Sequence, residues 1–234
     1  MKTNHFLVVM TAFTVASILL SSCESDDEAT PTFLTQSKVT NADSEYATCV
    51  TTIDSLPFET PSQTEADALH LMREEELLAR DVYQALFEKW GLAVFGNIAK
   101  SEEQHTNAVK KLLAKYGIED LAANHQPGVF QFEELQQLYN NLLAQGNVSL
   151  MDALKVGATI EDLDIADLEK LSDEIDNQDV LWVFGNLSKG SRNHLRSFVG
   201  QIESRGETYA PQYISDESFL NIMNSPHETG WVKP

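Results

Sequence analysis

The chain carries a carboxylate and an imidazole three residues apart, at Glu102 and His105, inside a run of apolar residues. The apolar positions around this pair recur in alternating steps of three and four, which is the spacing of one face of an α-helix. Polar groups on a buried helical face need partners, because burying them alone is costly. The pair therefore belongs either to a hydrogen-bonded polar layer or to a metal site.

Three other amphipathic stretches place a carboxylate or an imidazole at about the middle of their apolar face. These residues are Glu76, Glu161 and His194, with Asp164 one turn after Glu161. Carboxylate oxygens, with imidazole as a further partner, suit ferrous, ferric and manganous ions. Together with Glu102 and His105, these positions predict a buried metal site, in which Asp164 is an additional candidate ligand.

The alternative to a metal is a buried ionic layer, in which Glu102 and Glu161 pair with Arg80 or Arg192. A metal ion would compensate carboxylates that otherwise repel one another and take up protons. Four helices that each bring such a group to the same level favour the metal interpretation.

Four helices are needed to position these residues, and the sequence predicts an all-α fold. They are expected from Ser62 or Thr64 to Trp90, over 92–116, from about 149, and over 178–203, with Gly91 and Gly117 as stop signals. A short turn joins the first two, whereas 118–148 form a long connection with a short helix over 132–144. Two hairpins joined by one long crossover predict a ferritin-like four-helix bundle over 63–205, followed by a C-terminal tail over 206–234.

The N-terminal residues have the pattern of a processed export signal. The apolar run over 6–20 is shorter than the roughly 20 residues of a membrane-spanning helix. It ends in Leu20-Ser21-Ser22-Cys23, which resembles a bacterial lipobox and implies a lipoprotein signal peptide over 1–22 with a lipid on Cys23. An ordinary secretory signal is the alternative. We expect 23–62 to form a flexible acidic and polar tether, and the domain to lie in the cell envelope, lipid-anchored at the periplasmic face or the cell surface.

The composition narrows the class of partner. The formal charge of −20 argues against nucleic acid, whose phosphates the protein would repel. Cys49 is the only cysteine besides Cys23, so the chain is not a disulfide scaffold. The expected partners are a membrane, through the lipid, and metal ions.

Three segments resemble the ligand helices of rubrerythrins. Residues 76–83 read Glu-Leu-Leu-Ala-Arg-Asp-Val-Tyr, residues 98–105 end in Glu-Glu-Gln-His, and Val-Phe-Gly-Asn-Leu at 183–187 leads to His194. Taken whole, residues 65–215 resemble the DUF2202 family of ferritin-like proteins. The resemblance implies iron, as two ions or one, with manganese as the alternative metal, held by Glu76, Glu102, His105, Glu161 and His194.

One departure from that pattern concerns the last helix, where a full di-iron site would offer Glu-x-x-His. This chain has Ser191-Arg192-Asn193-His194, and serine is a poor iron ligand, so Asp164 would supply the compensating carboxylate. We expect Tyr83, Ser191 and Arg192 to contact ligands rather than metal, although Tyr83 also fits a core tyrosine.

The sequence is compatible with two functions. The first is ferroxidase- or peroxidase-like chemistry with oxygen or peroxide, which needs a partner reductant because the chain has no Cys-x-x-Cys pair. The second is a non-catalytic bundle whose metal site is structural, used for storage, degenerate or empty.

Overall fold

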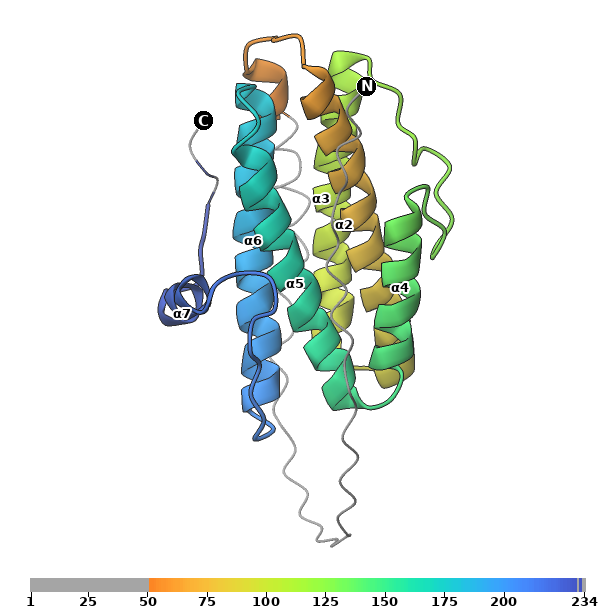
Figure 1. Ribbon diagram of the computed structural model, residues 1–234, viewed down its shortest axis with the longest axis vertical. Coiled ribbons are helices and arrows are strands. Elements are labelled where there is room, and N and C mark those ends of the chain that lie inside the picture. The colour runs from red at the N-terminus through yellow and green to blue at the C-terminus, as the bar shows by residue number, and fades with distance from the viewer. Residues whose placement is uncertain (1–50, 231, 233–234) are drawn as a thin grey trace, which may run out of the picture.

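The structure of the protein, a computed structural model, describes residues 51–230 and 232, and every regular element in that part is helical. Four long helices lie side by side, with a shorter helix along one side and another outside (Figure 1). The elements are α2 (Gln63–Trp90), α3 (Ala93–Tyr116), α4 (Glu133–Gly146), α5 (Leu150–Ser172), α6 (Gln178–Glu203) and α7 (Asp216–Asn224). Helices α2, α3 and α6 begin and end within a few residues of the predicted positions, and α5 begins at its predicted start.

Helices α2 and α3 form the first hairpin, as the sequence predicts. Ser62 caps α2 in a reciprocal capping box with Glu65. The helix ends at Gly91, whose φ of 67° is the left-handed conformation that glycine adopts without strain. Only Gly91 and Leu92 separate α2 from α3, so the two helices must run antiparallel and pack along their length.

Helices α5 and α6 form the second hairpin, and the connection between the hairpins carries α4. Helix α4 packs against both α2 and α5. Two acidic residues of α2, Glu74 and Asp81, hold this connection in place. Asp81 accepts hydrogen bonds from His125 and from the backbone N–H of Gly128, each at 2.8 Å.

The structure attaches both ends of the described chain to the bundle. Residues 51–55 are helical, Ile53 is fully buried, and Lys115 Nζ donates to the Ile53 carbonyl at 2.7 Å. Residues 51–55 therefore contact the bundle, within the segment through 62 that was expected to form a flexible tether. At the other end, Asp162 accepts backbone hydrogen bonds from Gln212, Tyr213 and Ile214, so the C-terminal segment wraps over α5 before α7.

No helix among these residues is both long and apolar enough to cross a membrane. The predicted signal peptide over 1–22, the predicted lipid attachment at Cys23 and the tether up to residue 50 lie outside the described residues.

The apolar core is divided into two clusters along the bundle. One contains Tyr83, Phe95 and Phe198, and the other contains Met72 and Leu112. On α2, α3 and α6, the candidate ligands fall between the parts of the helix that belong to the two clusters. On α5, Glu161 and Asp164 lie near the end of the part that belongs to the first cluster, before Leu168 of the second. The candidate metal ligands therefore form one polar layer across the interior of the bundle.

Candidate metal centre

The structure brings together the five residues on which the sequence analysis converged. Glu102 lies at the centre, and its two oxygens face different imidazoles. Its Oε2 is 2.7 Å from His105 Nδ1, and its Oε1 is 2.8 Å from His194 Nδ1. The outer carboxylates complete the arrangement, since Glu76 Oε2 is 3.2 Å from His105 Nδ1 and Glu161 Oε2 is 3.4 Å from His194 Nδ1.

The cluster consists of two overlapping groups of three potential ligands. Glu76, Glu102 and His105 form one, and Glu102, Glu161 and His194 form the other. In each group, one ligand atom from every residue lies within 4.8 Å of the other two. Each group thus offers two carboxylates and one imidazole, and Glu102 is shared between them.

Several of these atoms are buried without a hydrogen-bond partner in the described part of the chain. They are Glu102 Oε1, Glu161 Oε2 and His194 Nδ1. The first and last are only 2.8 Å apart, yet they are not aligned as a donor and an acceptor. Buried polar atoms are nearly always hydrogen-bonded in folded proteins. A nitrogen and two oxygens that converge at ion-pair distances without hydrogen-bond geometry are arranged as atoms that can also share a cation.

Burial and mutual charge shift the pKa values within the layer. Burial raises the pKa of Glu76 to about 8, and the neighbouring His105 only partly opposes that rise. Burial alone would lower the pKa of His194, but the negative charges of Glu102 and Glu161 outweigh the effect of burial and raise this pKa to about 10. Burial would raise the pKa of Glu102 as well, but His194 and His105 hold it well below its usual range. Protons on the imidazoles therefore partly compensate the central carboxylate.

The other residues that the sequence singled out lie around this layer. The Tyr83 hydroxyl donates to Glu161 Oε1 at 2.5 Å and is fully buried. The Ser191 hydroxyl donates to the Leu187 carbonyl of its own helix at 3.2 Å, and this bond disfavours Ser191 as a metal ligand. Asp164 is buried and its Oδ2 has no hydrogen-bond partner among the described residues, but Asp164 belongs to neither group of three ligands.

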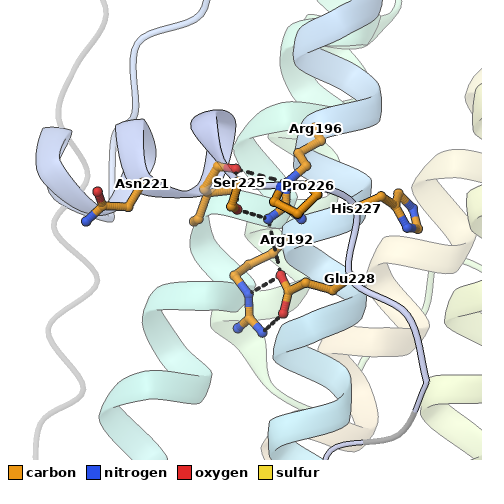
Figure 2. A pocket seen from close by; sticks show the side chains of 8 residues that line it. Arg192, Arg196, Asn221, Ser225, Pro226, His227 and Glu228 are labelled. Carbon is orange, nitrogen blue, oxygen red and sulfur yellow. Dashed lines mark hydrogen bonds and ion pairs between the residues drawn. The ribbon is translucent and has the colours of Figure 1, made fainter.

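The arginine-paired alternative does not hold in this structure. Arg80 pairs with Asp81 and Glu103 rather than with a residue of the layer. Arg192 makes a two-pronged pair with Glu228, at 2.7 and 2.5 Å, and this carboxylate also contacts Arg196 (Figure 2). Arg192, Arg196 and Glu228 line a pocket of about 430 Å³, and none of the five candidate metal ligands lines it. The expectation that Arg192 contacts a ligand is therefore wrong, because its guanidinium pairs with the Glu228 carboxylate of the C-terminal segment.

Two carboxylates beside the site are buried although they lie off the apolar stripe of α2. Glu74 is 1% exposed and accepts backbone hydrogen bonds from Gln131 and Phe132 at the start of α4. Glu75 is 6% exposed, and burial raises its pKa well above the usual range. The position of Glu74 is set by the segment that leads into α4, so the periodicity of α2 alone carries no signal for it.

Two further contacts to the imidazoles are not predicted by the sequence. Ser101 Oγ lies 3.1 Å from His194 Nε2. Gly190 faces the other imidazole so closely that an added Cβ would lie 2.4 Å from His105 Cε1. Both contacts join α3 to α6, and a spacing rule within one helix cannot detect them.

Comparison with known proteins places the chain in a family. A family model described as "Uncharacterized protein domain (DUF2202)" matches residues 65–226. The protein MJ0754 of Methanocaldococcus jannaschii, described as uncharacterized, is 52% identical over 178 residues, which are 76% of this chain and 96% of that protein. The crystal structure of this hypothetical protein superposes with a TM-score of 0.73 over 74% of this chain and 99% of that chain. The chain therefore belongs to the DUF2202 family.

Proposed function

We propose that this protein is a ferritin-like bundle that binds two divalent transition-metal ions, iron or manganese, in the layer between its four long helices. The observation that carries the proposal is the convergence of Glu102 Oε1, Glu161 Oε2 and His194 Nδ1, buried and without hydrogen-bond partners in the described residues. In ferritin-like proteins, two helices each supply a glutamate and the other two each supply Glu-x-x-His. This chain keeps that pattern except at Ser191.

The shared position of Glu102 supports two ions rather than one. Its two oxygens face different imidazoles, so one carboxylate can bridge two metals. Glu76 and His105 would hold one ion, and Glu161 and His194 the other. With Asp164, the layer has four carboxylates, whose full ionisation would balance two divalent cations and remove the repulsion between buried like charges.

The surroundings of the site suit a reaction with a small oxidant. Glu76, Glu102 and Glu161 are at most 1% exposed, while the side chains of His105 and His194 are 15% and 12% exposed. A small molecule would therefore approach from the imidazole side of the layer, between α3 and α6. Bound iron would supply electrons to dioxygen or peroxide, as in ferroxidase- or peroxidase-like chemistry, and a separate reductant would restore it.

The residues of the chain have distinct tasks in this proposal. The glutamates bind and bridge, and the imidazoles complete each set of ligands. Tyr83 holds the Glu161 carboxylate in place through its hydroxyl. Because the pKa values of Glu76 and His194 are raised, metal uptake near pH 7 must displace protons from both.

Metal content and ligand variants test the proposal. We expect about two ions of iron or manganese per chain after anaerobic loading, followed by oxidation of the ferrous ions on exposure to dioxygen or peroxide. Glu76→Gln should reduce the stoichiometry by about one ion, since Glu76 belongs to one group, whereas Glu102→Gln should abolish binding at both. Glu103→Gln is the matched control, because this neighbour is exposed and outside the layer. Equal metal binding by Glu102→Gln and Glu103→Gln would contradict the proposed site, and stable binding without oxidation would favour a storage or structural role.

We also propose that a lipid on Cys23 anchors the domain in the cell envelope. Support comes from the lipobox-like residues 20–23 and the apolar run before them. Cys23→Ser should release the protein from the membrane fraction, and continued membrane association would contradict the anchor.

A further inference from the structure

The two nitrogens of the His194 ring face different environments. Nδ1 lies 2.8 Å from Glu102 Oε1 and 3.4 Å from Glu161 Oε2, inside the layer. Nε2 lies 3.1 Å from the Ser101 hydroxyl, which belongs to the facing helix α3. Ser101 directly precedes Glu102 in the chain, so the same turn of α3 provides the central carboxylate and the hydroxyl that contacts the ring of His194.

This separation decides which tautomer can bind a metal. A neutral imidazole binds a cation through its unprotonated nitrogen and keeps the proton on the other nitrogen. If Nδ1 is the ligand, Nε2 must carry the proton and donate it, and the Ser101 oxygen is positioned to accept. Hydrogen-bond partners of this kind orient a metal-bound imidazole and make it a better ligand.

His105 does not share this arrangement. Its Nδ1 also faces the carboxylates, at 2.7 Å from Glu102 and 3.2 Å from Glu76. Its Nε2 edge lies against Gly190, where an added Cβ would be only 2.6 Å away. The two imidazoles of the layer therefore have different supports, a hydroxyl for His194 and close backbone packing for His105.

We propose that Ser101 is a positioning residue that holds His194 in the tautomer and ring orientation in which Nδ1 is the metal ligand. The proposal rests on the proposed function for its consequence on metal affinity. The contact between Ser101 and His194 in the protein without metal is independent of it. The two parts can therefore be tested separately on the full-length protein.

The first test measures the His194 ring itself. In metal-free protein, the Nε2–H proton of His194 should give a protected imidazole signal in ¹⁵N-resolved NMR spectra, because it is hydrogen-bonded to Ser101. Ser101→Ala should remove the protection, and Ser101→Thr should retain it because threonine keeps the hydroxyl. Ser197→Ala is the matched control, since the Ser197 hydroxyl bonds the Asn193 carbonyl of its own helix.

The second test measures affinity for Co²⁺, used as a spectroscopic probe for a site of carboxylates and imidazoles. Loss of a group that orients a metal-bound histidine weakens metal binding by about 10- to 100-fold, and we expect that loss for Ser101→Ala. Ser101→Thr should restore most of the affinity, and Ser197→Ala should match the wild type. The cobalt absorption bands should also change in Ser101→Ala, because the ligand field of one ion loses its fixed imidazole.

The outcomes separate the two proposals. If Ser101→Ala keeps the protected Nε2–H signal, or binds Co²⁺ as tightly as the wild type, Ser101 does not position His194 and the inference is overturned. A Ser101→Thr variant that behaves like Ser101→Ala would overturn it as well, because the effect would then not come from the hydroxyl. If the wild type binds no Co²⁺ while the signal still depends on the hydroxyl, the metal function fails and the support of the ring by Ser101 stands.

Discussion

Replacing Gly190 by alanine tests the close packing of α6 against His105. The added Cβ would lie 2.4 Å from His105 Cε1 and 2.6 Å from Nε2. Non-bonded carbon atoms are comfortable at about 3.5 Å or more, so the ring must move by roughly 1 Å. The imidazole is the movable end of its side chain, and we expect the ring rather than the backbone to give way.

The Gly190→Ala substitution affects both the stability of the protein and its metal binding. Alanine favours an α-helix over glycine by about 1 kcal/mol, whereas overpacking costs about 1–3 kcal/mol. The free energy of unfolding should therefore change by between about 0 and −2 kcal/mol. Metal ligands must be held within about 0.5 Å of their productive positions, so a shift of roughly 1 Å should remove His105 as a ligand and lower the metal stoichiometry.

Gly200→Ala is the matched control, because Gly200 lies on the same helix and an added Cβ there would meet nothing within 4 Å. It should raise the free energy of unfolding by about 1 kcal/mol and leave metal binding unchanged. Urea denaturation of the metal-free proteins and anaerobic Fe²⁺ titration give the two readouts. If Gly190→Ala is as stable as Gly200→Ala and binds metal like the wild type, our account of the packing around His105 is refuted.

Three further predictions concern the rest of the layer and its surroundings. Ser191→Ala should leave metal stoichiometry unchanged, because the hydroxyl bonds its own helix; a lower metal content by mass spectrometry would make Ser191 a ligand. Asp162→Ala should release the C-terminal segment to proteolysis and destabilise the protein by about 3 kcal/mol or more, since several hydrogen bonds to one buried carboxylate are lost, while metal content stays constant. Metal-free protein should lose stability in urea melts as the pH rises from about 6 to about 10. The folded pKa values of Glu76 and His194, about 8 and about 10, lie above their unfolded values, so the folded state holds these protons more tightly and loses that advantage as they dissociate. A flat profile over this range would contradict the raised values.

The sequence predicts the long helices well because their signals are local. The spacing of apolar residues and the glycines at 91 and 117 mark helix α2 and helix α3 without reference to any other part of the chain. The same periodicity identifies the ligand candidates, since a polar residue inside an apolar stripe must face the interior. When four helices carry such residues at similar heights, their meeting in one layer follows from the bundle geometry.

The features of the site that the sequence did not reveal depend on contacts between distant segments. Glu74 lies off the apolar stripe of α2 but is buried by the start of α4, about 57 residues later in the chain. Arg192 was expected beside the ligands, but Glu228 of the C-terminal segment pairs with it. Ser101 and Gly190 became visible as part of the site only when α3 and α6 were placed side by side. In each case, the sequence shows the type of residue but does not show which distant residue it contacts.

The polar layer links the folding of this protein to its proposed ligand. Burial raises the pKa values of Glu76, Glu161 and Asp164, which means that the ionised carboxylates are less stable in the fold than in water. The two apolar clusters on either side hold these groups together in spite of that cost. A bound cation removes the repulsion, and it competes with the protons that compensate the layer in its absence. Metal should therefore stabilise the bundle most strongly at alkaline pH, where the metal-free layer has lost its protons and its carboxylates face one another ionised.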